Sequence, residues 1–95
     1  MIQIDDSGDL RTFMQELRTW ALDNQEKSVL LKIQEAERRG MSASELLIEY
    51  GVALRDIKAN FLNRLPENFQ KLLDRAILVS DDAVNLGSFT YKRAH

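Results

Sequence analysis

Apolar residues in this chain recur at spacings of three and four, and this periodicity restricts the fold more than any other feature of the sequence. Residues at such spacings share one side of a helix with about 3.6 residues per turn. The clearest run is Leu47, Tyr50, Leu54, Ile57 and Phe61. The other three stripes are Leu10, Phe13, Met14, Leu17, Trp20 and Ala21; Val29, Leu30, Ile33 and Ala36; and Phe69, Leu72, Leu73, Ala76 and Ile77. The sequence therefore predicts an all-α fold, a four-helix antiparallel bundle-like domain.

Capping residues indicate where these helices begin and end within a single domain of residues 1–95. Ser7 or Asp9 can cap the first helix, and Gly40 can adopt the left-handed conformation that closes the second. Ser42 followed by Glu45 has the spacing of a capping box. A residue that precedes proline, as Leu65 does, leaves the helical region. The predicted helices lie near residues 9–23, 25–39, 43–64 and 66–79.

The last sixteen positions, residues 80–95, are predicted to form a nonhelical tail, because turn formers are frequent there. Phe89 and Tyr91 alternate with polar residues, which is typical of a strand, and Ile2 and Ile4 alternate in the same way near the other end. Two alternatives remain: the two arms pair as short strands, or both are loose tails. The second is favoured because domain termini are commonly loose.

The residue types that support catalysis and metal binding are scarce. The chain has no cysteine, which excludes thiolate nucleophiles and cysteine-ligated metals, and its one histidine is His95. The acidic doublets Asp5-Asp6 and Asp81-Asp82 are adjacent in sequence, so their side chains point in different directions. We therefore expect no enzyme, no catalytic residues, no metal site, no cofactor and no small-molecule substrate.

The charge of the chain bears on its location and its partners. The formal net charge is -2, and Asp5, Asp6 and Asp9 make the amino-terminal segment acidic. A nucleic-acid partner is possible but is not favoured, since binding phosphates requires several excess basic residues. No stretch has the ~18 consecutive apolar residues of a membrane span, and the amino-terminal segment lacks the pattern of a signal peptide. We expect a cytoplasmic protein that does not bind a membrane.

Residues 44–64 also resemble a helix-turn-helix signature, with apolar residues on both sides of Gly51. In that alternative a DNA-binding regulator would offer four side chains to phosphates or base edges. These are Arg55, Lys58, Asn60 and Asn63. The apolar stripe continues through Gly51 without a change of phase, so one uninterrupted helix is the favoured interpretation.

The predicted third helix carries a second apolar row, away from the first. The row consists of Ile48, Val52, Ala59 and Leu62. Either this helix lies centrally among the other three, or one of its faces binds a second molecule. The sequence leaves these alternatives open. The expected function is a noncatalytic protein-binding module, a small bacterial-type regulator, adaptor or inhibitor. Its predicted contacts, with a protein partner or in a homodimer, are Ile48, Val52, Leu62, Phe89 and Tyr91.

Overall fold

The computed structural model describes the backbone of residues 3–93 and the side chains of residues 3–83. Its four α-helices and one 3-10 turn are α1 (Ser7–Asp23), α2 (Lys27–Arg39), α3 (Ala43–Phe61), η1 (Leu62–Arg64) and α4 (Glu67–Arg93). No strand occurs in this part of the chain. The predicted all-α class with four helices is confirmed. Ile2, which belongs to the alternative in which the two arms pair as strands, lies outside the described residues.

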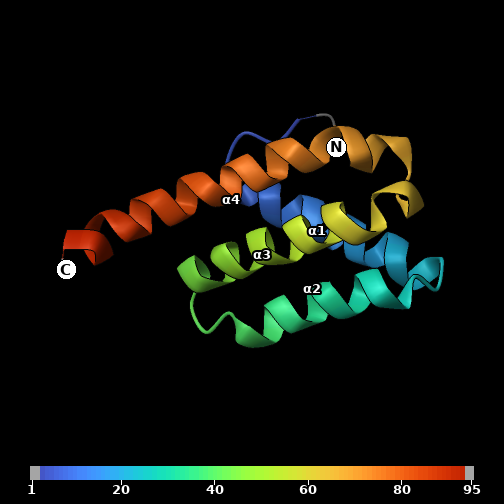
Figure 1. Cartoon of the computed structure of the whole chain (residues 1–95), viewed down its shortest axis with the longest axis horizontal. Coiled ribbons are helices and arrows are strands. Elements are labelled where there is room, and N and C mark those ends of the chain that lie inside the picture. Colours follow the sequence, from blue (N-terminus) through green and yellow to red (C-terminus); the bar gives the residue numbers. More distant parts are fainter. Residues whose placement is uncertain (1–2, 94–95) are drawn as a thin grey trace.

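Three of the helices form a layer that the fourth covers from one side. In Figure 1, α3 lies between α2 and α4, and α1 lies behind this layer. Successive helices run in opposite directions, as short connections require. The helix α3 contacts all three of the others. It therefore lies centrally among the other three helices, which is one of the two alternatives that its two apolar rows left open.

The core is built from the predicted stripes. The rings of Phe13 and Phe69 meet edge to face with their centroids 5.7 Å apart, and Trp20, which is half-buried, lies 6.0 Å from Phe69. Such aromatic pairs add to the free energy gained by burial alone. The fully buried large side chains come from all four helices and include Leu10, Met14, Ile33, Leu54 and Leu73. The aromatic contacts of Phe69 with Phe13 and Trp20 join the start of α4 to α1.

Carboxylates cap α1 in a way that differs from the prediction. Asp6, not Ser7 or Asp9, is the N-cap, and its Oδ1 accepts a hydrogen bond from the Asp9 amide at 2.8 Å. Asp9 lies in the first turn, where its Oδ2 accepts from the Asp5 amide at 2.9 Å. The helix starts two residues before the predicted position because this reciprocal pair satisfies two backbone amides there.

The predicted capping box at the start of α3 is confirmed. The Ser42 hydroxyl accepts a hydrogen bond from the Glu45 amide at 3.2 Å, and the Glu45 carboxylate accepts from the Met41 amide at 3.2 Å. The carboxylate reaches one residue further back than in the usual box, as Asp9 does at α1. Both helices therefore begin with the same arrangement.

The prediction that Gly40 is left-handed is wrong, because its φ is -77°. Glycine is required there by close packing: a Cβ on Gly40 would lie 2.6 Å from the Cα of Leu46. The left-handed residue is instead Gln25, with φ 55°, in the turn after α1. The Glu26 amide donates to the Ala21 carbonyl at 2.8 Å, and the Gln25 amide to the Leu22 carbonyl at 3.3 Å. These two bonds form a Schellman motif.

Replacing Gln25 with glycine should stabilise the protein. A left-handed conformation costs a residue with a Cβ roughly 1–2 kcal/mol, whereas glycine adopts it freely but loses about 0.5–1 kcal/mol through chain entropy. We expect Gln25→Gly to raise the free energy of unfolding by about 0.5–1 kcal/mol, measured by urea denaturation. Gln25→Ala serves as the control, because it retains the strained conformation. A Gln25→Gly variant less stable than Gln25→Ala would contradict the assignment.

The boundaries of α3 and α4 also differ from the prediction. The predicted helix over 43–64 is continuous through Gly51 but ends at Phe61, after which η1 forms a tighter turn. Leu65 is extended, with ψ 144°, as expected of a residue before proline. The helix α4 does not stop at residue 79. Residues 80–83, assigned by the sequence to the tail, belong to α4, whose backbone is helical to Arg93.

The continuation of α4 has a tertiary cause. The buried Ser80 hydroxyl donates a hydrogen bond to the Leu47 carbonyl of α3 at 2.8 Å, and Ala83 packs against the core. Turn-forming residues remain helical when such contacts stabilise the helix, because sequence propensity is a weak influence beside packing.

The amino-terminal arm that precedes α1 is packed against the bundle. Ile4 is fully buried, and its carbonyl accepts a hydrogen bond from Arg75 Nε of α4 at 2.8 Å. Arg75 Nη2 also lies 3.8 Å from the Asp5 carboxylate. The favoured expectation of a loose arm is therefore wrong for residues 3–6, because the Ile4 side chain completes the core between α1 and α4.

Candidate functional site

One side of α3 is left open by the other helices, and we call it the α3 face. It comprises Ile48, Val52, Arg55, Asp56 and Ala59, which recur at helical spacing on α3. Val52, at its centre, is 44% exposed, Ile48 is half-buried and Ala59 is exposed. The structure therefore brings together three of the four residues in the second apolar row. Leu62, the fourth, is half-buried in η1 and packs against the core.

A contact between small residues sets the position of α3 against α4. Gly51 is buried, and a Cβ added to it would lie 2.0 Å from the Ser80 Oγ and 2.9 Å from the Ser80 Cβ. Only glycine at this position permits the Ser80 hydroxyl to reach the Leu47 carbonyl. The glycine thus serves helix packing rather than a turn.

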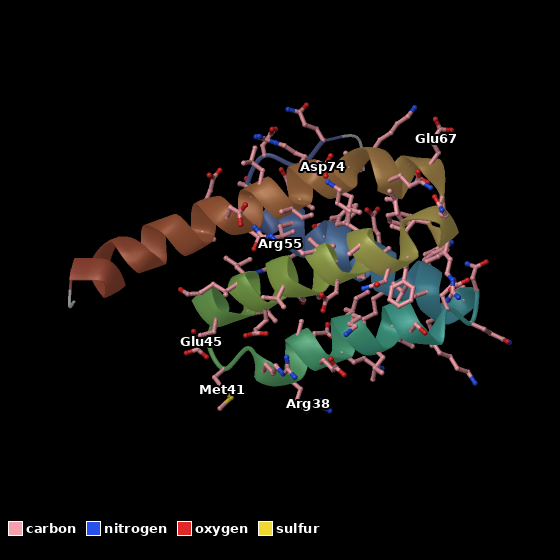
Figure 2. All side chains as sticks on the ribbon, in the orientation of Figure 1. Arg38, Met41, Glu45, Arg55, Glu67 and Asp74 are labelled. Carbon is pink, nitrogen blue, oxygen red and sulfur yellow. The ribbon has the colours of Figure 1, made fainter. Side chains whose placement is uncertain are left out.

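Ion pairs border the α3 face on both sides. Arg55 pairs with Asp81 of α4, Lys58 pairs with Asp74 of α4, and on the opposite side Lys32 Nζ of α2 lies 3.5 Å from the Asp56 carboxylate. Figure 2 shows Arg55 between α3 and α4, with Asp74 on α4 nearer the start of that helix. All three pairs are exposed or partly exposed, so each contributes little to stability. The two carboxylates of α4 nevertheless neutralise Arg55 and Lys58 of α3.

The helix-turn-helix geometry is wrong for this segment. Since α3 is continuous through Gly51, it has no turn that could separate a supporting helix from a recognition helix. Lys58, Asn60 and Asn63 do line one depression, of about 340 Å³, at the end of α3, whereas Arg55 lies apart beside Gly51. The Asn60 amide donates to the Asp56 carbonyl at 3.0 Å. Two of the four predicted nucleic-acid residues, Arg55 and Lys58, are in ion pairs.

A polar cluster joins α1, α2 and α3 away from the α3 face. The phenol of Tyr50, 5% exposed, is hydrogen-bonded to the Glu37 carboxylate, and Arg18 Nε lies 3.4 Å from the same carboxylate. Burial raises the pKa of the Tyr50 phenol above its ordinary value of 10.0, and Glu37 raises this pKa further by its charge and its hydrogen bond. Arg11 and Arg18 act in the opposite direction. The folded state therefore favours the neutral phenol.

The raised pKa of Tyr50 predicts a loss of stability in alkali. Below pH 10.0 the phenol is neutral in both states; as the pH rises further, the unfolded chain releases this proton first, so the free energy of unfolding falls. We expect Tyr50→Phe to reduce this fall, measured by urea denaturation at about pH 9 and about pH 11. The wild type measured at the same two pH values is the control. Equal losses for the wild type and Tyr50→Phe would contradict the assignment.

A shallow depression of about 440 Å³ runs along α1 and is lined by residues of that helix, including Thr12, Gln15 and Trp20, and by its C-cap Asn24. Among the residues whose side chains the structure describes, no group of three histidine, cysteine or acidic residues could hold a metal ion. Within the same part of the chain, no helix is long and apolar enough to cross a membrane. The predicted contacts Phe89 and Tyr91 lie outside the described side chains.

Sequence reasoning missed several exposed apolar residues near the α3 face. Leu31 of α2 is 52% exposed and Leu78 of α4 is 46% exposed, while Met41, in the loop before α3, is 84% exposed. A signal for two of them exists in the sequence. Leu31 and Leu78 are apolar but out of phase with the buried stripes of their helices, so they are expected to face solvent.

The fold and its exposed face define a small four-helix domain whose central helix is open along one side. Comparison of the chain with protein-family models, with curated proteins and with solved structures finds no match in any of the three.

Proposed function

We propose that this protein is a noncatalytic protein-binding module that acts through the α3 face, as a small bacterial-type regulator, adaptor or inhibitor in the cytoplasm. One observation carries the proposal: Val52 is 44% exposed in the middle of a helix that the other helices cover on its remaining sides. An exposed valine between a half-buried isoleucine and an exposed alanine provides the apolar centre that a helix-packing interface requires.

The surroundings of the α3 face favour a protein over a nucleic acid as partner. The ion pairs of Arg55 with Asp81 and of Lys58 with Asp74 place carboxylates beside the two basic residues that would contact phosphates. Each carboxylate would repel a polyanion. An apolar partner surface, in contrast, can pack on Val52 without breaking these ion pairs. The noncatalytic role and the absence of a cofactor are part of the proposal.

The test is retention of a partner by the immobilised protein from an extract of its native host, washed at low and then at high salt. A partner bound through apolar contacts should survive the high-salt wash, because salt weakens mainly electrostatic attachment. Val52→Asp should lower the amount retained at least about tenfold, since it places a charge in the apolar centre. Leu22→Asp is the matched control: Leu22 is 62% exposed at the end of α1, away from the α3 face.

The same experiment can overturn the proposal. Equal retention of every protein by the wild type and Val52→Asp would exclude the α3 face as the binding surface. Retention of nucleic acid, lost in the high-salt wash and reduced in the double variant Arg55→Ala with Lys58→Ala, would instead favour the DNA-binding alternative. Circular dichroism should confirm that each variant remains helical.

A further inference from the structure

Exposed apolar residues occur on the same side of all three helices in the α2–α3–α4 layer. Val52 lines a hollow between α2 and α3 together with Lys32 and Glu35, and Leu31 lies four residues before Glu35, on the same stripe of α2. On α4, Leu78 lies four residues after Asp74 and three before Asp81, the two carboxylates that pair with α3. Leu31, Val52 and Leu78 therefore face away from α1. We call the side of the layer that they share the open layer face.

The two outer helices of this layer have opposite charge. The helix α2 contains four basic residues, Lys27, Lys32, Arg38 and Arg39, and two acidic ones. Residues 67–83 of α4 contain four acidic residues, Glu67, Asp74, Asp81 and Asp82, and two basic ones. In Figure 1 these helices form opposite edges of the layer, with α3 between them. Of the two outer helices, α2 thus has an excess of positive charge and residues 67–83 of α4 have an excess of negative charge, with Val52 exposed on the helix between them.

We propose that a second copy of this chain docks on the open layer face, about a twofold axis parallel to α3. This inference rests on the proposed function and names the partner that the α3 face binds. A rotation about that axis exchanges the two edges, so that α2 of each copy lies over α4 of the other. The basic α2 of each copy then faces the acidic α4 of the other copy, so this contact occurs twice in the dimer. At the centre, Val52 of one copy meets the partner's Val52.

Charge selects this axis over the other possible twofold. An axis in the plane of the interface but perpendicular to α3 would place α2 over the partner's α2 and α4 over the partner's α4. Like charges would then face each other along both edges, which costs several kcal/mol at an interface. With the axis parallel to α3, Lys32 lies opposite Asp81 of the partner subunit, because Lys32 and Asp81 pair with neighbouring residues of α3, Asp56 and Arg55.

A stable dimer requires an interface of sufficient area on each copy. Specific interfaces bury about 800 Å² on each partner. The plane of Figure 1 contains the two longer extents of the molecule, 43 and 26 Å. A dimer over this face would cover Leu31, Val52 and Leu78 together with the ion pairs that link α3 to α2 and to α4. The apolar centre supplies affinity, and the charged edges determine orientation.

The test uses two charge reversals in the full-length chain, Lys32→Glu and Asp81→Lys, with the dissociation constant of the dimer measured by sedimentation equilibrium. Each variant alone should dimerise at least about tenfold more weakly than the wild type, because each introduces two like-charge contacts per dimer. An equimolar mixture of the two variants should recover a dimer within about threefold of the wild-type constant, since residue 32 of each copy again meets an opposite charge. Loss of an intramolecular ion pair predicts no such recovery.

Three outcomes overturn the proposal. The first is a wild-type chain that stays monomeric up to about 1 mM, even if the α3 face retains a different protein, in which case the proposed function stands and its partner is another chain. The second is a wild-type dimer whose constant is unchanged in both reversals. The third is failure of the mixture to associate, which would exclude this axis. Leu78→Ser should also weaken the dimer, whereas Leu22→Ser should not, and circular dichroism establishes that every variant is folded.

Discussion

Gly51→Ala is expected to destabilise the protein by about 2–3 kcal/mol, although alanine is the better helix former by about 0.5–1 kcal/mol. The added methyl group would lie 2.0 Å from the Ser80 Oγ and 2.9 Å from the Ser80 Cβ. Rotation of the Ser80 hydroxyl would relieve the first contact but would break its hydrogen bond to the Leu47 carbonyl, leaving a buried polar group without a partner. The second contact requires α3 and α4 to separate, which opens the core.

The measurement is urea denaturation, with a thermal melt in which the expected loss corresponds to about 10–20 °C for a domain of this size. The matched variant is Gly51→Ala combined with Ser80→Gly, which removes from α4 the hydroxymethyl group that the methyl group added to α3 would meet. In a double-mutant cycle, Ser80→Gly should recover part of the stability lost in Gly51→Ala. Strictly additive losses would mean that the two residues do not touch.

Ile4→Ala should lower the free energy of unfolding by about 2–4 kcal/mol, the range for truncating a buried isoleucine. Ile4 has 0% exposure, although it precedes the first helix. Its removal would leave a cavity between α1 and α4, next to the Arg75 side chain that binds the Ile4 carbonyl. The loss would show as a lower urea midpoint with an unchanged m value.

Gln3→Ala is the matched control for the amino-terminal arm. Gln3 is exposed and, among the residues that the structure describes, its side chain donates a hydrogen bond to the Asp5 carboxylate alone, at 2.8 Å, so its replacement should change stability by less than about 0.5 kcal/mol. If Ile4→Ala and Gln3→Ala had equally small effects, the arm would not be part of the core.

Local patterns predicted the helical fold because every residue that defines them is near in sequence. The stripe from Leu47 to Phe61 covers α3, and the Ser42–Glu45 cap lies where the sequence predicts it. The continuation of α4 past residue 79 could not be predicted in this way. It depends on Ser80 reaching Leu47, 33 positions away in the sequence, and no local signal records that contact.

The candidate site was predicted in part. Ile48 and Val52 share the α3 face, as their spacing on one helix requires. Leu31 and Leu78 join Val52 on the open layer face only through the arrangement of the helices. The same arrangement brings Arg55 and Lys58 into ion pairs with Asp81 and Asp74. These pairs could not be predicted when the sequence suggested Arg55 and Lys58 as nucleic-acid contacts. Charge pairing between helices depends on their order in the layer, and short-range periodicity carries no information about that order.

The sequence by itself determined that the chain forms four amphipathic helices, because helix periodicity and capping act within a few residues. Only the tertiary structure decided that α3 is central, that Gly51 is a contact point for α4 rather than a turn, and that Ile4 belongs to the core. Each of these depends on which surfaces meet in space. Burial and steric overlap are properties of pairs of elements, so they appear only when the helices pack together.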